Sequence, residues 1–243
     1  MQLMIFKDYS ALSFHAAKEI VDLVRNKPDA VLCLASGDTP RQTYNLVAET
    51  ATSKQVDFSR CTFVGLDEWV GISPDNEGSC HYFLYTHLFE PLRIQTSHIH
   101  LFNGLSEDFG NECKKMDAII RKKGGIDLIV VGVGMNGHVG FNEPGVPPNL
   151  YSHVVALDST TQSVGQKYFK QSTELLQGIT LGLQHLLESR KAIMMASGRK
   201  KAEVMRKALE EPVSREMPAC IIRNHKQGMV FLDEEAAALI ISK

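Results

Sequence analysis

The sequence predicts an α/β fold in which a mainly parallel sheet carries helices on both faces. Short apolar runs rich in Val and Ile recur along the chain, and stretches with apolar residues at helical spacing lie between them. Strands that alternate with helices form largely parallel sheets. Continuously apolar strands are typical of sheets that are buried on both faces. We therefore predict a Rossmann-like three-layer sandwich.

The expected elements follow from this pattern. The apolar runs predict strands at residues 30–35, 62–66, 126–133, 154–157, 192–196, 219–222 and 229–232. Helical spacing runs from Leu12 to Val24 and recurs at residues 41–49, 82–88, 108–120 and 200–209. No repeat, low-complexity tract or Pro/Gly/Ser-rich linker divides the chain, so we expect residues 1–243 to form one domain.

Composition and charge narrow the classes of partner. The 243 residues include 26 Lys and Arg and 28 Asp and Glu, which gives a net charge of −2, and 44% are hydrophobic. This is ordinary globular composition without a basic stripe, so we expect small-molecule partners and neither nucleic acid nor membrane. The N-terminus lacks a signal-like segment, and no apolar run approaches the roughly 18 residues of a membrane span. We expect a cytoplasmic protein.

The five cysteines have no recognisable spacing. They lie at positions 33, 61, 80, 113 and 220, which matches neither a zinc site nor a small disulfide scaffold. We interpret them as reduced structural thiols.

The loop after the first buried strand favours anion binding. Ser36, Gly37, Asp38 and Thr39 precede a helical segment, with Thr39 expected as the N-cap and Pro40 at the first helical position. Free N–H groups at a helix N-terminus are suited to a phosphate. An ordinary capped turn is the alternative, and the carboxylate of Asp38 would repel a phosphate unless it turns away.

Two acids follow the second strand. Successive strand residues point to opposite faces, so one of Asp67 and Glu68 is expected in a cleft, and Asp67 is the better candidate. Asp67 stands beside Trp69, and a partly desolvated Asp can act as a general base. A surface Asp-Glu turn is the alternative.

The glycine-rich loop after residues 126–133 carries the densest set of polar residues. Its G-x-G-x-x-G spacing suggests dinucleotide binding, but later Gly and Pro residues exclude the continuous helix that this motif requires. Asn136, His138 and Glu143 instead predict acid–base chemistry, in which Glu143 or Asn136 orients the imidazole. The spacing fits neither a His-based metal site nor a Gly-x-Ser-x-Gly nucleophile.

Two lysines further along are candidates for binding a phosphate. Lys201 lies at an expected helix start after residues 192–196, and Lys167 lies between them and the glycine-rich loop. Taken alone, solvated surface lysines are the alternative.

Together, SGDTP, LDEW, GVGMNGHVGFNEPG and ASGRKKA resemble the glucosamine-6-phosphate deaminase (isomerase) family in order and spacing over nearly the whole chain. The resemblance implies ring opening, aldose-to-ketose isomerisation and loss of ammonia without a cofactor. By position, Asp67 would move the proton between the first two sugar carbons, and His138 would open the ring with Glu143 and Asn136. The phosphate ligands would be Ser36, Gly37, Asp38, Thr39, Lys167 and Lys201.

The sequence departs from the family pattern at several of these positions. Asn136 stands where many members have Asp, Lys167 replaces an expected Arg, and Asp38 replaces a small residue. Galactosamine 6-phosphate is therefore a second candidate substrate. The other candidate functions are a 6-phosphogluconolactonase, which should lack Glu143, and a non-catalytic sugar-phosphate sensor. The chain is expected to be a monomer or a homo-oligomer.

Overall fold

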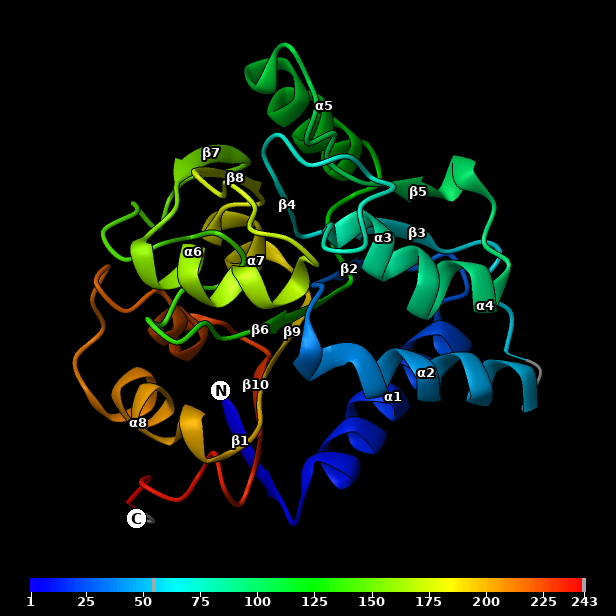
Figure 1. Cartoon of the computed structure of the whole chain (residues 1–243). Coiled ribbons are helices and arrows are strands. Elements are labelled where there is room, and N and C mark those ends of the chain that lie inside the picture. Colours follow the sequence, from blue (N-terminus) through cyan, green and yellow to red (C-terminus); the bar gives the residue numbers. More distant parts are fainter. Residues whose placement is uncertain (54–55, 242–243) are drawn as a thin grey trace.

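A seven-stranded parallel sheet forms the centre of the fold in the computed structural model, which describes residues 1–53 and 56–241 (Figure 1). All of its neighbouring strands pair in parallel. The strand order is β1 (Gln2–Phe6), β10 (Gly228–Asp233), β9 (Lys191–Ala196), β6 (Leu128–Gly132), β2 (Val31–Leu34), β3 (Thr62–Gly65) and β5 (Ile99–His100). The predicted fold class is confirmed.

Helices cover both faces of this sheet. One face packs against α1 (Tyr9–Asn26), α2 (Asp38–Ser53), α3 (Cys80–Leu84), the π-helix Tyr85–Phe89 and α4 (Glu90–Leu92). The other packs against α5 (Phe109–Lys122), α7 (Leu183–Glu188), α8 (Ala202–Glu210) and the 3-10 helix Pro218–Asn224.

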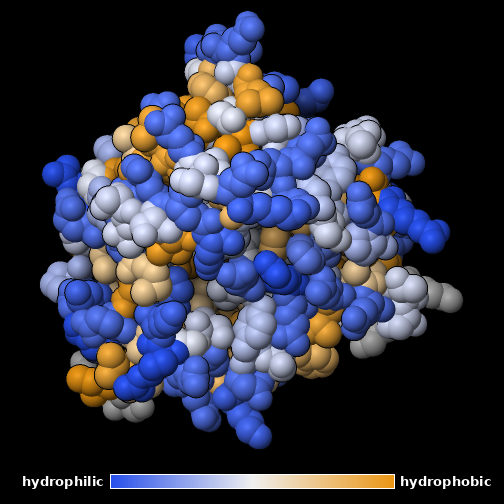
Figure 2. Space-filling model, in the orientation of Figure 1, coloured by the Kyte–Doolittle hydropathy of each residue, from blue (hydrophilic) through white to orange (hydrophobic). Residues whose placement is uncertain are grey.

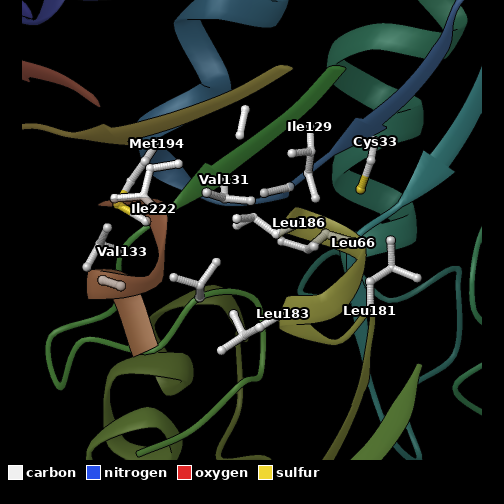
Figure 3. Close-up of a cluster of buried hydrophobic side chains, with 14 of the residues drawn as sticks. Cys33, Leu66, Ile129, Val131, Val133, Leu181, Leu183, Leu186, Met194 and Ile222 are labelled. Atoms are coloured by element: carbon white, nitrogen blue, oxygen red, sulfur yellow. The ribbon is translucent and has the colours of Figure 1, made fainter. Parts of the chain in front are cut away.

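Alternate residues of each central strand enter the two cores. Along β6, Leu128 and Val130 face α1 and α2, whereas Ile129 and Val131 face α5 and α7. Figure 3 shows the second of these cores, in which Cys33, Ile129 and Met194 from the strands meet Leu186 and Ile222. The central strands are therefore apolar at every position because both of their faces are buried.

A second, three-stranded antiparallel sheet stands at the carboxyl edge of the first. It contains β4 (Asp67–Trp69), β8 (Gln177–Thr180) and β7 (His153–Ala156). The chain passes from β3 into β4 at Leu66, whose carbonyl accepts from the Leu181 amide at 2.8 Å. β7 leads into α6 (Ser159–Gly165) and the 3-10 helix Gln166–Tyr168. This small sheet and α6 form a wall over the ends of the central strands.

Several details differ from the sequence-based expectation, which did not include the two edge strands β1 and β5 of the central sheet. Residues 154–157 fall mostly in β7, which belongs to the small sheet and is half-exposed rather than part of the parallel sheet. Residues 219–222 form a buried 3-10 helix, because a short apolar run does not distinguish a strand from a turn of helix. Helix α2 begins at Asp38, so Thr39 and Pro40 lie within its first turn.

The surface of the face shown in Figure 2 is mostly hydrophilic, with small separate hydrophobic areas. Among the described residues, no helix is both long enough and apolar enough to span a membrane.

Candidate active site

A cleft of about 440 Å³ lies beyond the carboxyl ends of β2, β3, β6 and β9, beneath the small sheet and α6. This is where ligands bind in open parallel sheets. Eight of the ten residues predicted for the site line it: Ser36, Gly37, Asp38, Thr39, Asp67, His138, Lys167 and Lys201. The other two, Asn136 and Glu143, contact each other and stand next to His138.

Asp67 is the first residue of β4 and pairs with Thr180 of β8, so the junction of the two sheets fixes its backbone. Its Oδ1 atom is buried and has no hydrogen-bond partner within the described part of the chain. Burial raises the pKa of Asp67 to about 6, against smaller opposing effects of the Cys80 side chain and the charge on His138. A carboxyl group with this pKa can both take and return a proton near neutral pH.

Glu68 points away from the cleft, as alternation along a strand requires. Its carboxylate accepts from the amides of Trp69 and Cys80 at 2.9 and 3.0 Å, and from the His81 amide at 2.9 Å. Glu68 thus caps the start of α3. Burial raises its pKa to about 7, although the three amide hydrogen bonds lower it.

His138 is held by a hydrogen-bonded chain. The Asn136 side chain donates to Glu143 Oε2 at 2.8 Å, and the same oxygen lies 3.6 Å from His138 Nδ1. Burial raises the pKa of Glu143, but the nearby His138 opposes burial, as does the hydrogen bond from Asn136, and the net shift is downward. Glu143 is therefore an anion suited to stabilising an imidazolium, a role that Asn136 cannot fill.

Gly134 makes room for the imidazole. A Cβ atom at this position would lie 2.3 to 2.4 Å from ring atoms of His138. The glycine spacing that resembles a dinucleotide motif thus serves to place a histidine against the backbone, and residues 133–152 contain no helix. The prediction of a structured loop is confirmed.

Thr161 belongs to the site but was missed by the sequence analysis. It lies on α6, is buried, lines the cleft, and places its Oγ1 atom 3.0 Å from His138 Nδ1. The sequence around it shows only a helix start, which Asp158 caps by accepting from the Thr160 amide at 2.8 Å. Nothing in that local pattern indicates contact with a histidine 23 residues earlier.

The predicted anion loop is a tight turn into α2. Gly37 has φ +112°, a left-handed conformation that favours glycine. The first amides of α2 have no acceptor within the helix, so the loop has free N–H groups and the positive end of a helix dipole. The Tyr9 hydroxyl supports the turn, because its single hydrogen is shared between the carbonyl oxygens of Asp38 and Thr39, each 2.9 Å away.

The two lysines reach the cleft from different elements. Lys201 ends the 3-10 helix Arg199–Lys201 and donates to the Val133 carbonyl at 2.5 Å. Burial, and to a smaller extent the charge of Lys167, lowers the pKa of Lys201 to about 8. Lys167 lies 2.7 Å from the Asp38 carboxylate, which also pairs with Arg41 at 3.0 Å. The Asp38 side chain is thus turned toward cations.

The five cysteines are buried and free, as expected. Burial, and to a smaller extent the charge of Asp67, raises the pKa of Cys33 and Cys80 well above the ordinary thiol value. Neither is suited to act as a nucleophile. Among residues 1–53 and 56–241, no group of three or more His, Cys, Asp or Glu side chains could hold a metal ion. The cleft thus brings together a carboxyl group, an oriented imidazole, a loop with free N–H groups at a helix N-terminus, and two lysines.

Comparison with known proteins shows the family of the chain. The family of glucosamine-6-phosphate isomerases and 6-phosphogluconolactonases matches residues 9–231. Glucosamine-6-phosphate deaminases of Thermoanaerobacter sp. (strain X514) and Bacillus pumilus are 36% and 38% identical; the matches cover 99% and 98% of this chain and 95% and 100% of theirs.

Solved structures extend the comparison. A monomeric glucosamine-6-phosphate deaminase superposes with a TM-score of 0.95 at 34% identity, covering 98% of this chain and all of that one. A 6-phosphogluconolactonase from Thermotoga maritima has a TM-score of 0.76 at 21% identity, over 96% of this chain and 99% of that one, which shows a shared fold. The chain belongs to the family of glucosamine-6-phosphate isomerases and 6-phosphogluconolactonases.

Proposed function

We propose that this protein is an amino-sugar-phosphate deaminase that converts glucosamine 6-phosphate and water to fructose 6-phosphate and ammonia. The observation that carries the proposal is the pairing, in one cleft, of a buried Asp67 carboxyl group with a His138 imidazole that Glu143 and Thr161 orient. Full-length relatives named glucosamine-6-phosphate deaminase support it.

In the proposed reaction His138 opens the pyranose ring. The imidazole takes the proton of the 1-hydroxyl group and returns a proton to the ring oxygen, which leaves an open-chain aldehyde. The Glu143 anion stabilises the imidazolium formed in between, and Asn136 holds Glu143 in place through its 2.8 Å hydrogen bond. Thr161 and Glu143 both contact Nδ1, so Nε2 is the ring nitrogen that remains for the substrate.

Asp67 then transfers a proton between the first two sugar carbons. Its carboxylate removes the proton from C2 while the aldehyde oxygen takes up a proton that the ammonium group at C2 releases, and an enolamine forms. The resulting carboxylic acid protonates C1, which leaves an iminium ion at C2, and water hydrolyses this ion to the ketone and ammonium, the protonated form of ammonia. A pKa near 6 suits this double role, because the group must act as a base and then as an acid in one turnover.

The loop before α2 and the two lysines are proposed to anchor the phosphate of the substrate. Ser36, Gly37 and Thr39 offer amide and hydroxyl groups, and Lys201 and Lys167 offer positive charge. Binding energy from a phosphate remote from C1 and C2 can hold these carbons against Asp67 and His138. All of these groups come from one chain, so we propose a single domain over residues 1–243 whose site is complete in the monomer.

The cellular compartment of the reaction can be inferred from the charge of a sugar-phosphate substrate. Doubly charged sugar phosphates do not cross a membrane freely, and we propose that the enzyme works in the cytoplasm, where such metabolites are retained.

The test is product analysis with purified protein and no added metal. Glucosamine 6-phosphate and galactosamine 6-phosphate are supplied in parallel in deuterated water, and ammonia and ketose phosphate are measured. We expect ammonia from the gluco epimer and deuterium at C1 of the product, since Asp67 exchanges its proton with solvent. Ammonia from the galacto epimer alone would change the substrate to its C4 epimer. Hydrolysis of 6-phosphogluconolactone without ammonia release would refute the deaminase assignment.

A further inference from the structure

Asp38 places a carboxylate in the part of the cleft that is proposed to hold a phosphate. Its Oδ2 atom lies 2.7 Å from Lys167 Nζ, and its Oδ1 atom lies 3.0 Å from a terminal nitrogen of Arg41. All three residues line the cleft. A cation that is available for the phosphate therefore already has an anionic partner from the chain itself.

This ion pair joins two walls of the cleft. Asp38 begins α2, while Lys167 lies 129 residues later on the 3-10 helix after α6. Lys201 differs, because its ammonium group donates to the Val133 carbonyl and the residue is half-buried. Of the two lysines, Lys167 is the one whose charge is already countered by a carboxylate.

We propose that Asp38 sets the affinity of the cleft for phosphorylated ligands by competing with their phosphate for Lys167. This inference rests on the proposed function, in which the same loop and lysines hold the sugar phosphate. A dianion that enters must displace the carboxylate from Lys167 or lie beside it, and either arrangement costs binding energy. The consequence is a weaker complex with both substrate and product, and therefore faster release of a product that carries the same phosphate.

The direct test is calorimetric titration of inorganic phosphate and fructose 6-phosphate into the wild type and Asp38→Asn, which removes the charge and keeps the shape. Asp38 and Lys167 are each about half exposed, so solvent moderates the effect. We expect Kd to fall roughly threefold to tenfold at low salt. The difference should shrink at 1 M salt, where the screening length is about 3 Å.

Glu77 provides a matched control. It lines the same cleft and pairs with Lys170 at 2.7 Å, so Glu77→Gln removes one negative charge from the rim without freeing Lys167. We expect Kd for this variant to stay within about twofold of the wild type. If Glu77→Gln tightens phosphate binding as much as Asp38→Asn does, the effect comes from the total negative charge around the cleft, and the inference is overturned.

A double-mutant cycle isolates the pair. In a Lys167→Met background, Asp38→Asn should gain little affinity, because the contested cation is gone. Unchanged or weaker phosphate binding by Asp38→Asn, or no phosphate binding by any variant, would refute the role of Asp38. These readouts need no turnover: phosphate binding without ammonia release would refute only the proposed function, and ammonia release without tightening would refute only this inference.

Discussion

Acidification should inactivate the enzyme through Asp67. Burial raises the pKa of this carboxyl group to about 6, and the proposed mechanism requires its ionised form to remove the C2 proton. Activity is therefore present above about pH 6 and is lost as the pH falls below this value. One pH unit below the pKa about one carboxyl group in eleven is ionised, so kcat/KM at pH 5 should be about one-eleventh of its value at pH 8.

The assay is the pH profile of kcat/KM for ammonia release, which reports groups of the free enzyme. The substrate phosphate titrates in the same range, with a pKa of about 6. The affinity for fructose 6-phosphate, which carries the same phosphate group, is therefore measured at each pH. The kcat/KM profile is then corrected for the pH dependence of this affinity.

Glu68 is the competing explanation, because its pKa is raised to about 7 by burial at the neighbouring position. Glu68→Gln keeps an amide oxygen for the α3 cap and removes this titration. If Asp67 is responsible, the acid limb stays near pH 6 in the variant, and circular dichroism confirms that the variant is folded. A limb that disappears in Glu68→Gln, or a profile that stays flat down to pH 5, would refute the assignment of Asp67 as the base.

Four further results are expected. Asp67→Asn should lower kcat by about 10² to 10⁴ while fructose 6-phosphate still binds in calorimetry, whereas a variant with wild-type turnover would remove Asp67 from the mechanism. Thr161→Val should lower kcat/KM by about 2- to 13-fold, since a net hydrogen bond of about 0.5–1.5 kcal/mol to His138 is lost, and an unchanged value would make this contact irrelevant. Phosphate binding should weaken about fivefold between pH 8 and pH 9, because the protonated fraction of Lys201 falls from about one half to about one in eleven, and Lys201→Arg, which stays charged, should not show this decline in titrations. Gly134→Ala should lower turnover by at least about tenfold, because a Cβ atom 2.3 Å from the His138 ring must displace the imidazole; steady-state kinetics at wild-type level would show that the ring position is not critical.

The sequence predicted the central strands well because their pattern has one physical cause. Residues 31–34 and 128–132 are apolar throughout, as burial on both faces requires, and both lie in the sheet. The strands of the small sheet lack this signal. β4 consists of Asp67, Glu68 and Trp69, and β8 begins with Gln177 and Gly178, so their pairing depends on tertiary contacts that no local pattern reports.

Some residues of the candidate site could be predicted from the sequence, and others could not. Residues on loops that directly follow a central strand, such as Asp67 and His138, could be predicted, because the fold places all such loops at one edge of the sheet. Thr161 could not, since it contacts His138 only because the small sheet folds α6 over that edge. The direction of the Asp38 side chain was equally inaccessible, because its partner Lys167 lies on the same distant segment.

The two walls of the cleft are therefore held in different ways. The Asp67 wall is fixed by β4–β8 pairing and by the hydrogen bond between Leu181 and Leu66. The α6 wall packs on Trp69 of β4 through Gly165 and Phe169, and it also makes two polar contacts across the cleft, Thr161 with His138 and Lys167 with Asp38. When a substrate draws Lys167 to its phosphate, Lys167 exchanges the Asp38 carboxylate for the phosphate. Lys167 therefore has an anionic partner whether the site is empty or filled. On the proposed function, Asp38 lowers phosphate affinity and, when no phosphate is bound, adds a polar contact between α2 and the segment that follows α6.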